Sequence, residues 1–110
     1  YHKSLKDLPL GLPKMHKKEI YLDVFNSYVI RTKEQFSLFK FLRKKGVEAL
    51  INWPKPLYHH KGLKLKKIFL KNNEKLCKEI ISLPIFPEMN KLEFSYIVNC
   101  IRLFFKRSKK

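Results

Sequence analysis

The C-terminal residues 90–110 constrain the fold most strongly, because they predict a long helix with one apolar face. Asn90 suits an N-cap, and Glu93 stands three positions later, where an acidic side chain completes such a cap. The apolar side chains that follow at helical spacing are Phe94, Ile97, Val98, Ile101, Phe104 and Phe105. A helix with such a stripe is stable only when another element covers it. We therefore expect a packed core built against this helix.

Extended patterns precede the helix at three places. Residues 20–31 are rich in β-branched and aromatic side chains and predict one long strand, or a strand kinked near Asn26. Residues 47–53 predict a second strand, which the prolines after Trp53 end. Residues 83–87 predict a short extended segment, and their prolines suit the edge of a sheet.

A helix is expected to begin after Thr32, its predicted N-cap, and to end near Gly46. Thr32 and Gln35 have the spacing of a capping box, and glycine is the usual residue after a helix end. The apolar positions at helical spacing are Phe36, Phe39 and Leu42.

Two shorter helical segments complete the pattern. Residues 1–7 resemble the end of a helix, which the prolines and the glycine of residues 8–13 break. Residues 73–81 predict a second helix, after a basic loop over residues 54–71. The expected apolar side of that helix is Leu76, Cys77, Ile80 and Ile81.

Helices and short strands therefore alternate, and three strands are few for a doubly wound domain. We expect an α+β fold in which a small sheet of about three strands is packed against helices. The 110 residues are near the commonest domain size, so residues 1–110 are expected to form a single domain.

The net charge of +16 comes from 25 Lys and Arg residues against 9 Asp and Glu residues. Of the basic residues, 21 are Lys, and they lie in short clusters along the chain. Specific recognition of phosphates and bases favours Arg, so a solvated basic surface is the preferred interpretation. A small basic nucleic-acid-binding module stays as an alternative function.

The sequence also argues against several other classes of protein. No apolar run approaches the roughly 18 residues that span a bilayer, and no signal peptide is evident, so we expect a cytoplasmic protein without a membrane partner. Cys77 and Cys100 fall on different expected helices and are interpreted as small core residues. The three glycines lie too far apart to form a phosphate-binding loop. Neither a metal site nor a catalytic residue is predicted.

Four segments, in order, carry more specific motifs. Residues 27–32 read SYVIRT, residues 50–57 read LINWPKPL, residues 74–88 read EKLCKEIISLPIFPE, and the final helix follows Asn90. They resemble the "YVIRT", "TLIHYPxPxHxQ" and "EKLxxExLSLPIYPEL" motifs and the closing helix of one family. Because the four segments follow one another in the family's order, the chain resembles the C-terminal domain of the DegT/StrS-type pyridoxal-phosphate-dependent nucleotide-sugar aminotransferases.

The resemblance implies the small domain of a fold-type-I aminotransferase, in which residues 1–12 would be the tail of a preceding helix. Such enzymes transfer an amino group, usually from glutamate, to a nucleotide-linked keto sugar, for lipopolysaccharide or related glycans. The cofactor, pyridoxal phosphate, acts as the electron sink. In the family the lysine that binds it lies in a large domain, and no segment here matches it. The chain alone is therefore expected to bind no cofactor and to be inactive, with the large domain and a second subunit as partners.

The resemblance also implies a substrate site after residue 51. The family's His and Tyr fall on Asn52 and Trp53, and its later His and Gln fall on Tyr58 and His60. All four residues differ from the family pattern but keep hydrogen-bonding groups. Asn52 and Trp53 are then expected to contact the sugar or its diphosphate, with Tyr58 and His60 nearby.

The residues alone leave other interpretations of this segment open. Trp53 could cap the core, and His59 and His60 could be solvated loop residues. The chain could also be a detached domain without a catalytic role.

Overall fold

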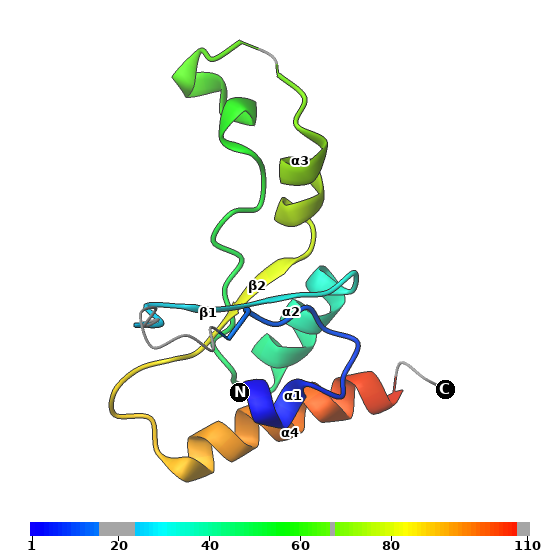
Figure 1. The fold of residues 1–110 in the computed structure, drawn as a ribbon, viewed down its shortest axis with the longest axis vertical. Helices are drawn as coiled ribbons and strands as arrows, with labels where there is room; N and C mark the ends of the chain where they lie inside the picture. The colour runs from blue at the N-terminus through cyan, green and yellow to red at the C-terminus, as the bar shows by residue number, and fades with distance from the viewer. Residues whose placement is uncertain (16–23, 67, 108–110) are drawn as a thin grey trace.

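A two-stranded antiparallel sheet lies at the centre of the fold, with helices packed on one side of it (Figure 1). The computed structural model describes residues 1–15, 24–66 and 68–107. In chain order the elements are α1 (His2–Leu5), β1 (Tyr28–Arg31), α2 (Gln35–Lys44), the 3-10 turns η1 (Leu57–His59) and η2 (Lys61–Leu63), α3 (Lys71–Cys77), β2 (Ile80–Leu83) and α4 (Lys91–Arg107). The expected α+β class is confirmed.

The sheet has fewer strands than the sequence predicts. Strands β1 and β2 pair with Tyr28 opposite Leu83 and Arg31 opposite Ile80. Among the described residues, two isolated bridges extend it, one between Gly11 and Arg31 and one between Leu50 and Ser82.

The strand expected over residues 47–53 is reduced to the single bridge at Leu50. Leu50 exchanges two backbone hydrogen bonds with Ser82, at 3.0 and 2.8 Å. The amide of Ala49 instead donates to the carbonyl of Val47 at 2.9 Å, which folds the chain into a tight turn. This turn prevents a longer ladder, so the prediction of a third strand is wrong.

Strand β1 is also shorter than the predicted strand over residues 20–31. It comprises Tyr28–Arg31, and Phe25 has a φ of 45°, a left-handed conformation that interrupts an extended chain. Residues 20–23 lie outside the described residues, so that part stays a prediction.

Helix α2 begins without the capping box expected from Thr32 and Gln35. The Thr32 hydroxyl oxygen accepts a hydrogen bond from the Glu34 amide at 3.1 Å, ahead of the helix. The Gln35 Nε2 instead donates to the carbonyls of Cys77 at 2.9 Å and Ile80 at 2.6 Å. The capping-box prediction is wrong because the Gln35 side chain forms hydrogen bonds to a segment that is distant in sequence.

The buried side of α2 differs from the predicted one at one position. Leu38 and Leu42 are fully buried and Phe39 is half-buried, whereas Phe36 is 59% exposed. The Lys40 ammonium lies over the Phe36 ring, 4.4 Å from its centroid. Leu38 therefore takes the core position that the sequence analysis gave to Phe36.

Gly46 ends α2 as predicted, with a φ of 74°. A Cβ there would meet no atom within 4 Å, so Gly46→Ala would change backbone strain alone. We expect this variant to lower the free energy of unfolding by about 1–2 kcal/mol. Gly62 has equally open surroundings without a positive φ, so Gly62→Ala should be neutral or slightly stabilising. Urea unfolding of both variants measures the difference, and equal stabilities would contradict the left-handed conformation of Gly46.

Helix α3 ends earlier than the helix predicted over residues 73–81. Ile81 does not continue the helix but lies in strand β2 and is 1% exposed. Of the extended segment predicted over residues 83–87, only Leu83 lies in this strand. The extended structure therefore begins three residues before the predicted segment.

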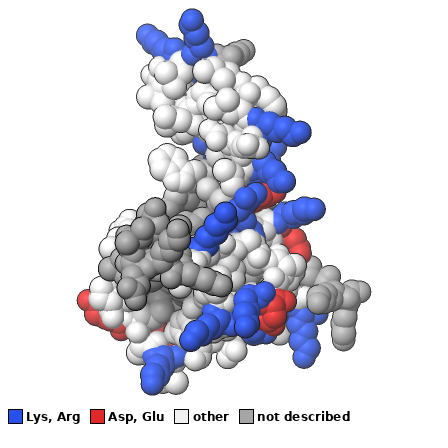
Figure 2. Space-filling view, in the orientation of Figure 1, with Lys and Arg blue, Asp and Glu red and all other residues white. Residues whose placement is uncertain are grey.

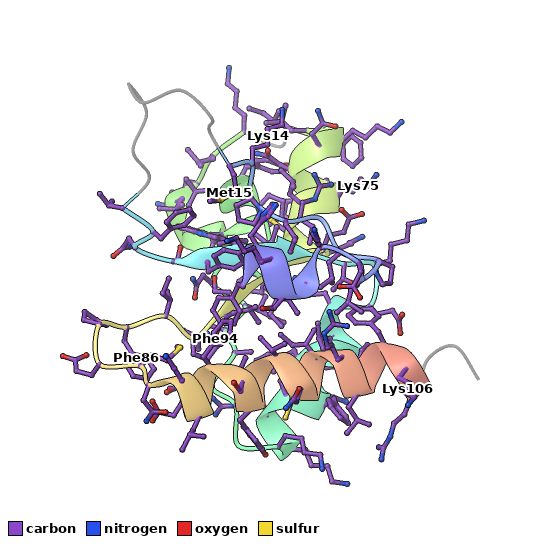
Figure 3. The ribbon with its side chains drawn as sticks, turned by 60° about the horizontal axis from the view of Figure 1, so that its bottom comes forward. Lys14, Met15, Lys75, Phe86, Phe94 and Lys106 are labelled. Carbon is purple, nitrogen blue, oxygen red and sulfur yellow. The ribbon has the colours of Figure 1, made fainter. Side chains whose placement is uncertain are left out.

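Helix α4 matches its prediction at the N-terminus. The Asn90 Oδ1 accepts hydrogen bonds from the amides of Leu92 and Glu93, both at 2.9 Å. The Glu93 carboxylate accepts one from the Asn90 amide at 2.9 Å, which completes the capping box. Phe94 lies on the side of α4 that faces the sheet (Figure 3), with its ring centroid 5.0 Å from that of Tyr1.

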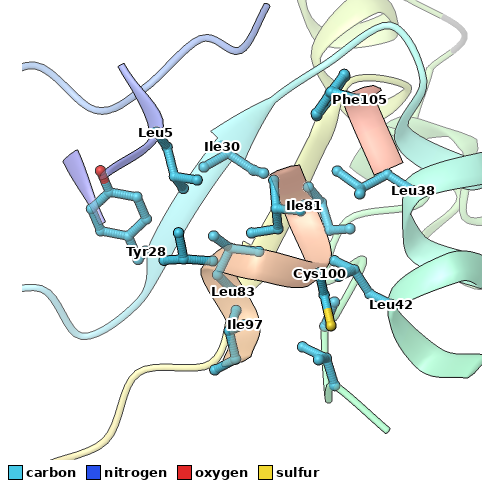
Figure 4. Packing of buried hydrophobic residues seen from close by; sticks show 14 residues of the cluster. Leu5, Tyr28, Ile30, Leu38, Leu42, Ile81, Leu83, Ile97, Cys100 and Phe105 are labelled. Carbon is cyan, nitrogen blue, oxygen red and sulfur yellow. The ribbon is translucent and has the colours of Figure 1, made fainter. Parts of the chain in front are cut away.

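The core lies between the sheet and helices α1, α2 and α4 (Figure 4). Its fully buried side chains are Leu5, Ile30, Leu38, Leu42, Ile81 and Ile101. Cys100 is buried in this core as expected, while Cys77 is only half-buried, and both are free thiols. One face of a small sheet and three helices thus share a single core.

Residues 54–79 form an arm that projects from this body (Figure 1). The arm contains η1, η2 and α3, and none of its described residues belongs to the buried hydrophobic core. In the part of the chain that the structure describes, no helix is long and apolar enough to cross a bilayer. The arm leaves the body directly after Trp53, so the predicted site residues lie on both sides of this junction.

Candidate functional site

A cavity of about 790 Å³ lies where the arm joins the body. Four segments line it, namely residues 26–27, residues 46–53, residues 82–86 and the first turns of α4. Asn52 and Trp53, two of the predicted site residues, belong to its wall. We call this cavity the groove.

The sheet edge fixes the position of Asn52 in the groove. The Leu50–Ser82 bridge anchors the chain two residues earlier, and the Asn52 Nδ2 donates to the Ser82 hydroxyl at 3.1 Å. Trp53 follows and is 58% exposed, so its indole is available to a ligand. Asn52 and Trp53 therefore both line the groove, and their contact with a sugar or its diphosphate stays a prediction.

Acidic and aromatic side chains also line the groove. Glu48 and Glu93 both line the groove, and Glu93 also caps α4. Tyr96 donates its hydroxyl to the Lys45 carbonyl at 2.8 Å, which ties α4 to the end of α2. Phe86, on the loop before α4, adds an apolar surface that is 43% exposed (Figure 3). The groove therefore combines apolar faces with hydrogen-bonding groups, which is typical of small-molecule sites.

Tyr58 and His60 lie in a different place, at a second cavity of about 410 Å³ on the arm. The Tyr58 hydroxyl donates to the Glu74 carboxylate at 3.0 Å and accepts from the Leu70 amide at 3.2 Å. The Glu74 carboxylate also lies 2.8 Å from His59 Nε2. Partial burial raises the pKa of the Tyr58 phenol, so Tyr58 is a hydrogen-bond donor at neutral pH.

The four predicted residues therefore form two pairs at two cavities. The sequence analysis missed Ser82, which anchors Asn52, and Glu74, which anchors Tyr58. Both anchors lie in the segment that resembles the family's third motif, but only the folded chain shows which residue each one holds.

The described residues offer little for a metal or for pyridoxal phosphate. Among them, no three His, Cys, Asp or Glu side chains form a cluster that could hold a metal ion. Every lysine in the described ranges is exposed, whereas a lysine that forms a Schiff base is characteristically desolvated. These residues therefore do not fit a complete pyridoxal phosphate site.

Comparison with known proteins gives consistent results. A protein of Geobacillus stearothermophilus named "Pleiotropic regulatory protein" is 34% identical over 86 residues, which cover 76% of this chain and 23% of that protein. The "dTDP-3-amino-3,6-dideoxy-alpha-D-galactopyranose transaminase" of Aneurinibacillus thermoaerophilus is 24% identical over 105 residues, 94% of this chain and 28% of that enzyme. The chain thus spans about a quarter of the length of these relatives.

A solved structure shows the same fold. The DegT DnrJ EryC1 StrS aminotransferase from Brucella abortus superposes with a TM-score of 0.83 and 24% identity, over 94% of this chain and 28% of that one. The sequence model of the DegT/DnrJ/EryC1/StrS aminotransferase family matches residues 1–102 of this chain. The resemblance seen in the motifs is confirmed, and the chain belongs to the DegT/DnrJ/EryC1/StrS aminotransferase family.

Proposed function

We propose that this chain is the C-terminal small domain of a longer pyridoxal-phosphate-dependent aminotransferase that acts on a nucleotide-linked keto sugar. Family membership supports amino-group transfer, and the relative named as a dTDP-amino-sugar transaminase supports a nucleotide sugar as substrate. We further propose that the enzyme is a cytoplasmic homodimer whose products serve lipopolysaccharide or related glycans. Membership in this family disfavours the alternative of a nucleic-acid-binding module.

The anchored groove is the observation that carries this proposal. The Ser82 hydroxyl accepts a hydrogen bond from one N–H of the Asn52 side-chain amide. This amide has a second N–H and a carbonyl oxygen. These groups suit the hydroxyls of a sugar or the oxygens of a diphosphate. The exposed Trp53 indole adds a flat apolar face and one N–H donor beside them. The groove would therefore orient a sugar, while the reacting groups come from elsewhere in the enzyme.

The cofactor chemistry belongs to another part of the longer enzyme in this proposal. Pyridoxal phosphate supplies an electron sink that stabilises a carbanion. Because the described lysines are exposed, we place the cofactor and its lysine in the large domain and expect this chain alone to be inactive. In this proposal, Tyr58 and His60 contact the same substrate only if the assembled enzyme brings the second cavity, on the arm, next to the groove.

The Asn52→Ala variant of the longer enzyme tests the groove. With a dTDP-linked keto sugar and glutamate, we expect kcat/KM for the sugar to fall by roughly tenfold or more, since a hydrogen bond to a charged group contributes about 1.5–3 kcal/mol. Cofactor absorbance should not change, because Asn52 is not placed near the cofactor.

Asn99→Ala is the matched control, because Asn99 is exposed on α4 and is not part of the groove wall. Its kcat/KM should equal that of the wild type. If Asn52→Ala also retains the wild-type value, the groove is not the substrate site.

A further inference from the structure

The groove differs in charge from the rest of the chain. The chain has 25 Lys and Arg residues and a net charge of +16. Figure 2 shows Lys and Arg side chains at the end of the arm, along one edge of it and over the body. By contrast, the described residues that line the groove include Glu48 and Glu93 but no Lys, Arg or His. A cavity in a strongly basic chain is therefore lined by negative charge.

Glu48 is the less constrained of the two carboxylates. Glu93 uses one oxygen to accept a hydrogen bond from the Asn90 amide, as part of the cap of α4. Glu48 is exposed, and within the described ranges its carboxylate forms neither a hydrogen bond nor an ion pair. Both oxygens of Glu48 are thus available to accept hydrogen bonds from a ligand in the groove.

The anchored Asn52 amide adds a further acceptor. Its Nδ2 donates to the hydroxyl of Ser82, a buried residue that is also bridged to Leu50. This hydrogen bond holds the amide in one orientation. The carbonyl oxygen of Asn52 bonds to none of the described residues, so it also is available to a ligand.

These acceptors favour a ligand that donates hydrogen bonds. A sugar hydroxyl can donate, and its hydrogen bond to a carboxylate is roughly twice as strong as one between neutral groups. An ionised phosphate offers only acceptor oxygens, and beside Glu48 and Glu93 it would meet two like charges. Among the described residues, no third carboxylate, His or Cys joins these two to hold a metal ion that could bridge to a phosphate.

The aromatic side chains of the groove favour the same ligand. Trp53, Phe86 and Tyr96 all line the groove and are all exposed. A sugar ring has apolar C–H faces and hydroxyl groups around its edge. Such a ring can pack a face against an aromatic side chain while its edge meets polar groups, whereas a diphosphate has no apolar face.

From these observations we propose that the groove binds the sugar ring and excludes the diphosphate, with Glu48 as a specificity-determining residue that accepts hydrogen bonds from the sugar hydroxyls. The proposal rests on the proposed function, and it decides between the sugar and the diphosphate as the ligand of Asn52 and Trp53. The diphosphate of the same substrate then binds outside the groove.

Calorimetric titration of the longer enzyme tests this proposal. The probes are dTDP-glucose and dTDP, which share the nucleoside and the diphosphate and differ in the sugar. Glu48→Ala should raise the Kd of dTDP-glucose roughly tenfold, because it removes a charge-assisted hydrogen bond, and should leave the Kd of dTDP within about twofold. Glu48→Gln keeps one acceptor oxygen without the charge, so its Kd for dTDP-glucose should lie between those of the wild type and Glu48→Ala.

Glu88→Ala is the matched control. Glu88 is exposed on the loop before α4 and is not among the residues that line the groove. The control removes the same charge from outside the cavity, so it measures the effect of net charge alone. Both of its Kd values should equal those of the wild type within about twofold.

Two results would overturn the proposal. One is an unchanged Kd of dTDP-glucose in Glu48→Ala. The other is tighter binding of dTDP by Glu48→Ala but not by Glu88→Ala, since relief of repulsion would place the diphosphate beside Glu48.

Transaminase activity of the wild-type enzyme, with a dTDP-linked keto sugar and glutamate, separates this proposal from the proposed function. An active enzyme whose Kd for dTDP-glucose does not depend on Glu48 refutes the role of Glu48 alone. An enzyme that binds dTDP-glucose through Glu48 but transfers no amino group refutes the proposed function. An enzyme that binds neither probe refutes both.

Discussion

Replacing Ile101 by alanine is expected to lower the free energy of unfolding by about 2–5 kcal/mol. Ile101 is 0% exposed at the middle of α4, inside the core that α1, α2 and both strands share. Removing three carbon atoms there leaves a cavity that the close-packed neighbours fill only in part. Urea unfolding followed by circular dichroism measures the loss.

Leu92→Ala on the same helix is the control for this variant. Leu92 is 82% exposed, so its truncation removes almost no buried surface and should change stability by less than about 0.5 kcal/mol. Similar losses for the two variants would show that α4 is not packed as the structure has it.

Helix α4 was predictable because its signals are local. The capping box joins Asn90 and Glu93, which are three residues apart, and the buried positions follow the helical repeat. The same holds for Gly46, whose left-handed conformation depends on its own backbone. Patterns within one element were enough to place these residues.

The errors arise where distant segments meet. Gln35 has the spacing of a capping box, yet its side chain bonds to backbone carbonyls 42 and 45 residues away. Residues 47–53 have the composition of a strand, yet only Leu50 finds a partner in the sheet. No pattern within these segments encodes the presence or absence of such partners.

The candidate site was predictable in part for the same reason. Motif resemblance identified Asn52 and Trp53, and both line the groove. It also placed Tyr58 and His60 nearby, because the family's later His and Gln fall on these two positions. The arm separates them, since an extended chain advances about 3.3 Å per residue and can carry position 60 well away from position 53.

Replacing Gln35 by alanine is expected to lower the free energy of unfolding by about 1–3 kcal/mol, because two half-buried carbonyls lose their donor and each hydrogen bond contributes about 0.5–1.5 kcal/mol. Gln35 is 8% exposed, and its Nε2 joins the end of α3 to the start of β2. The effect should be local as well as global. Hydrogen exchange of the amides near Ile81 should become faster in the variant, because the α3–β2 connection loses its anchor.

Two further variants separate hydrogen bonding from packing at this position. Gln35→Met keeps a similar volume without the donor, so it should lose nearly as much stability as Gln35→Ala. Ser37→Ala, on the exposed side of α2, should change stability by less than about 0.5 kcal/mol. If Gln35→Met were as stable as the wild type, packing would explain the role of Gln35. The α3–β2 connection, and with it the base of the arm, would then be held by the sheet alone.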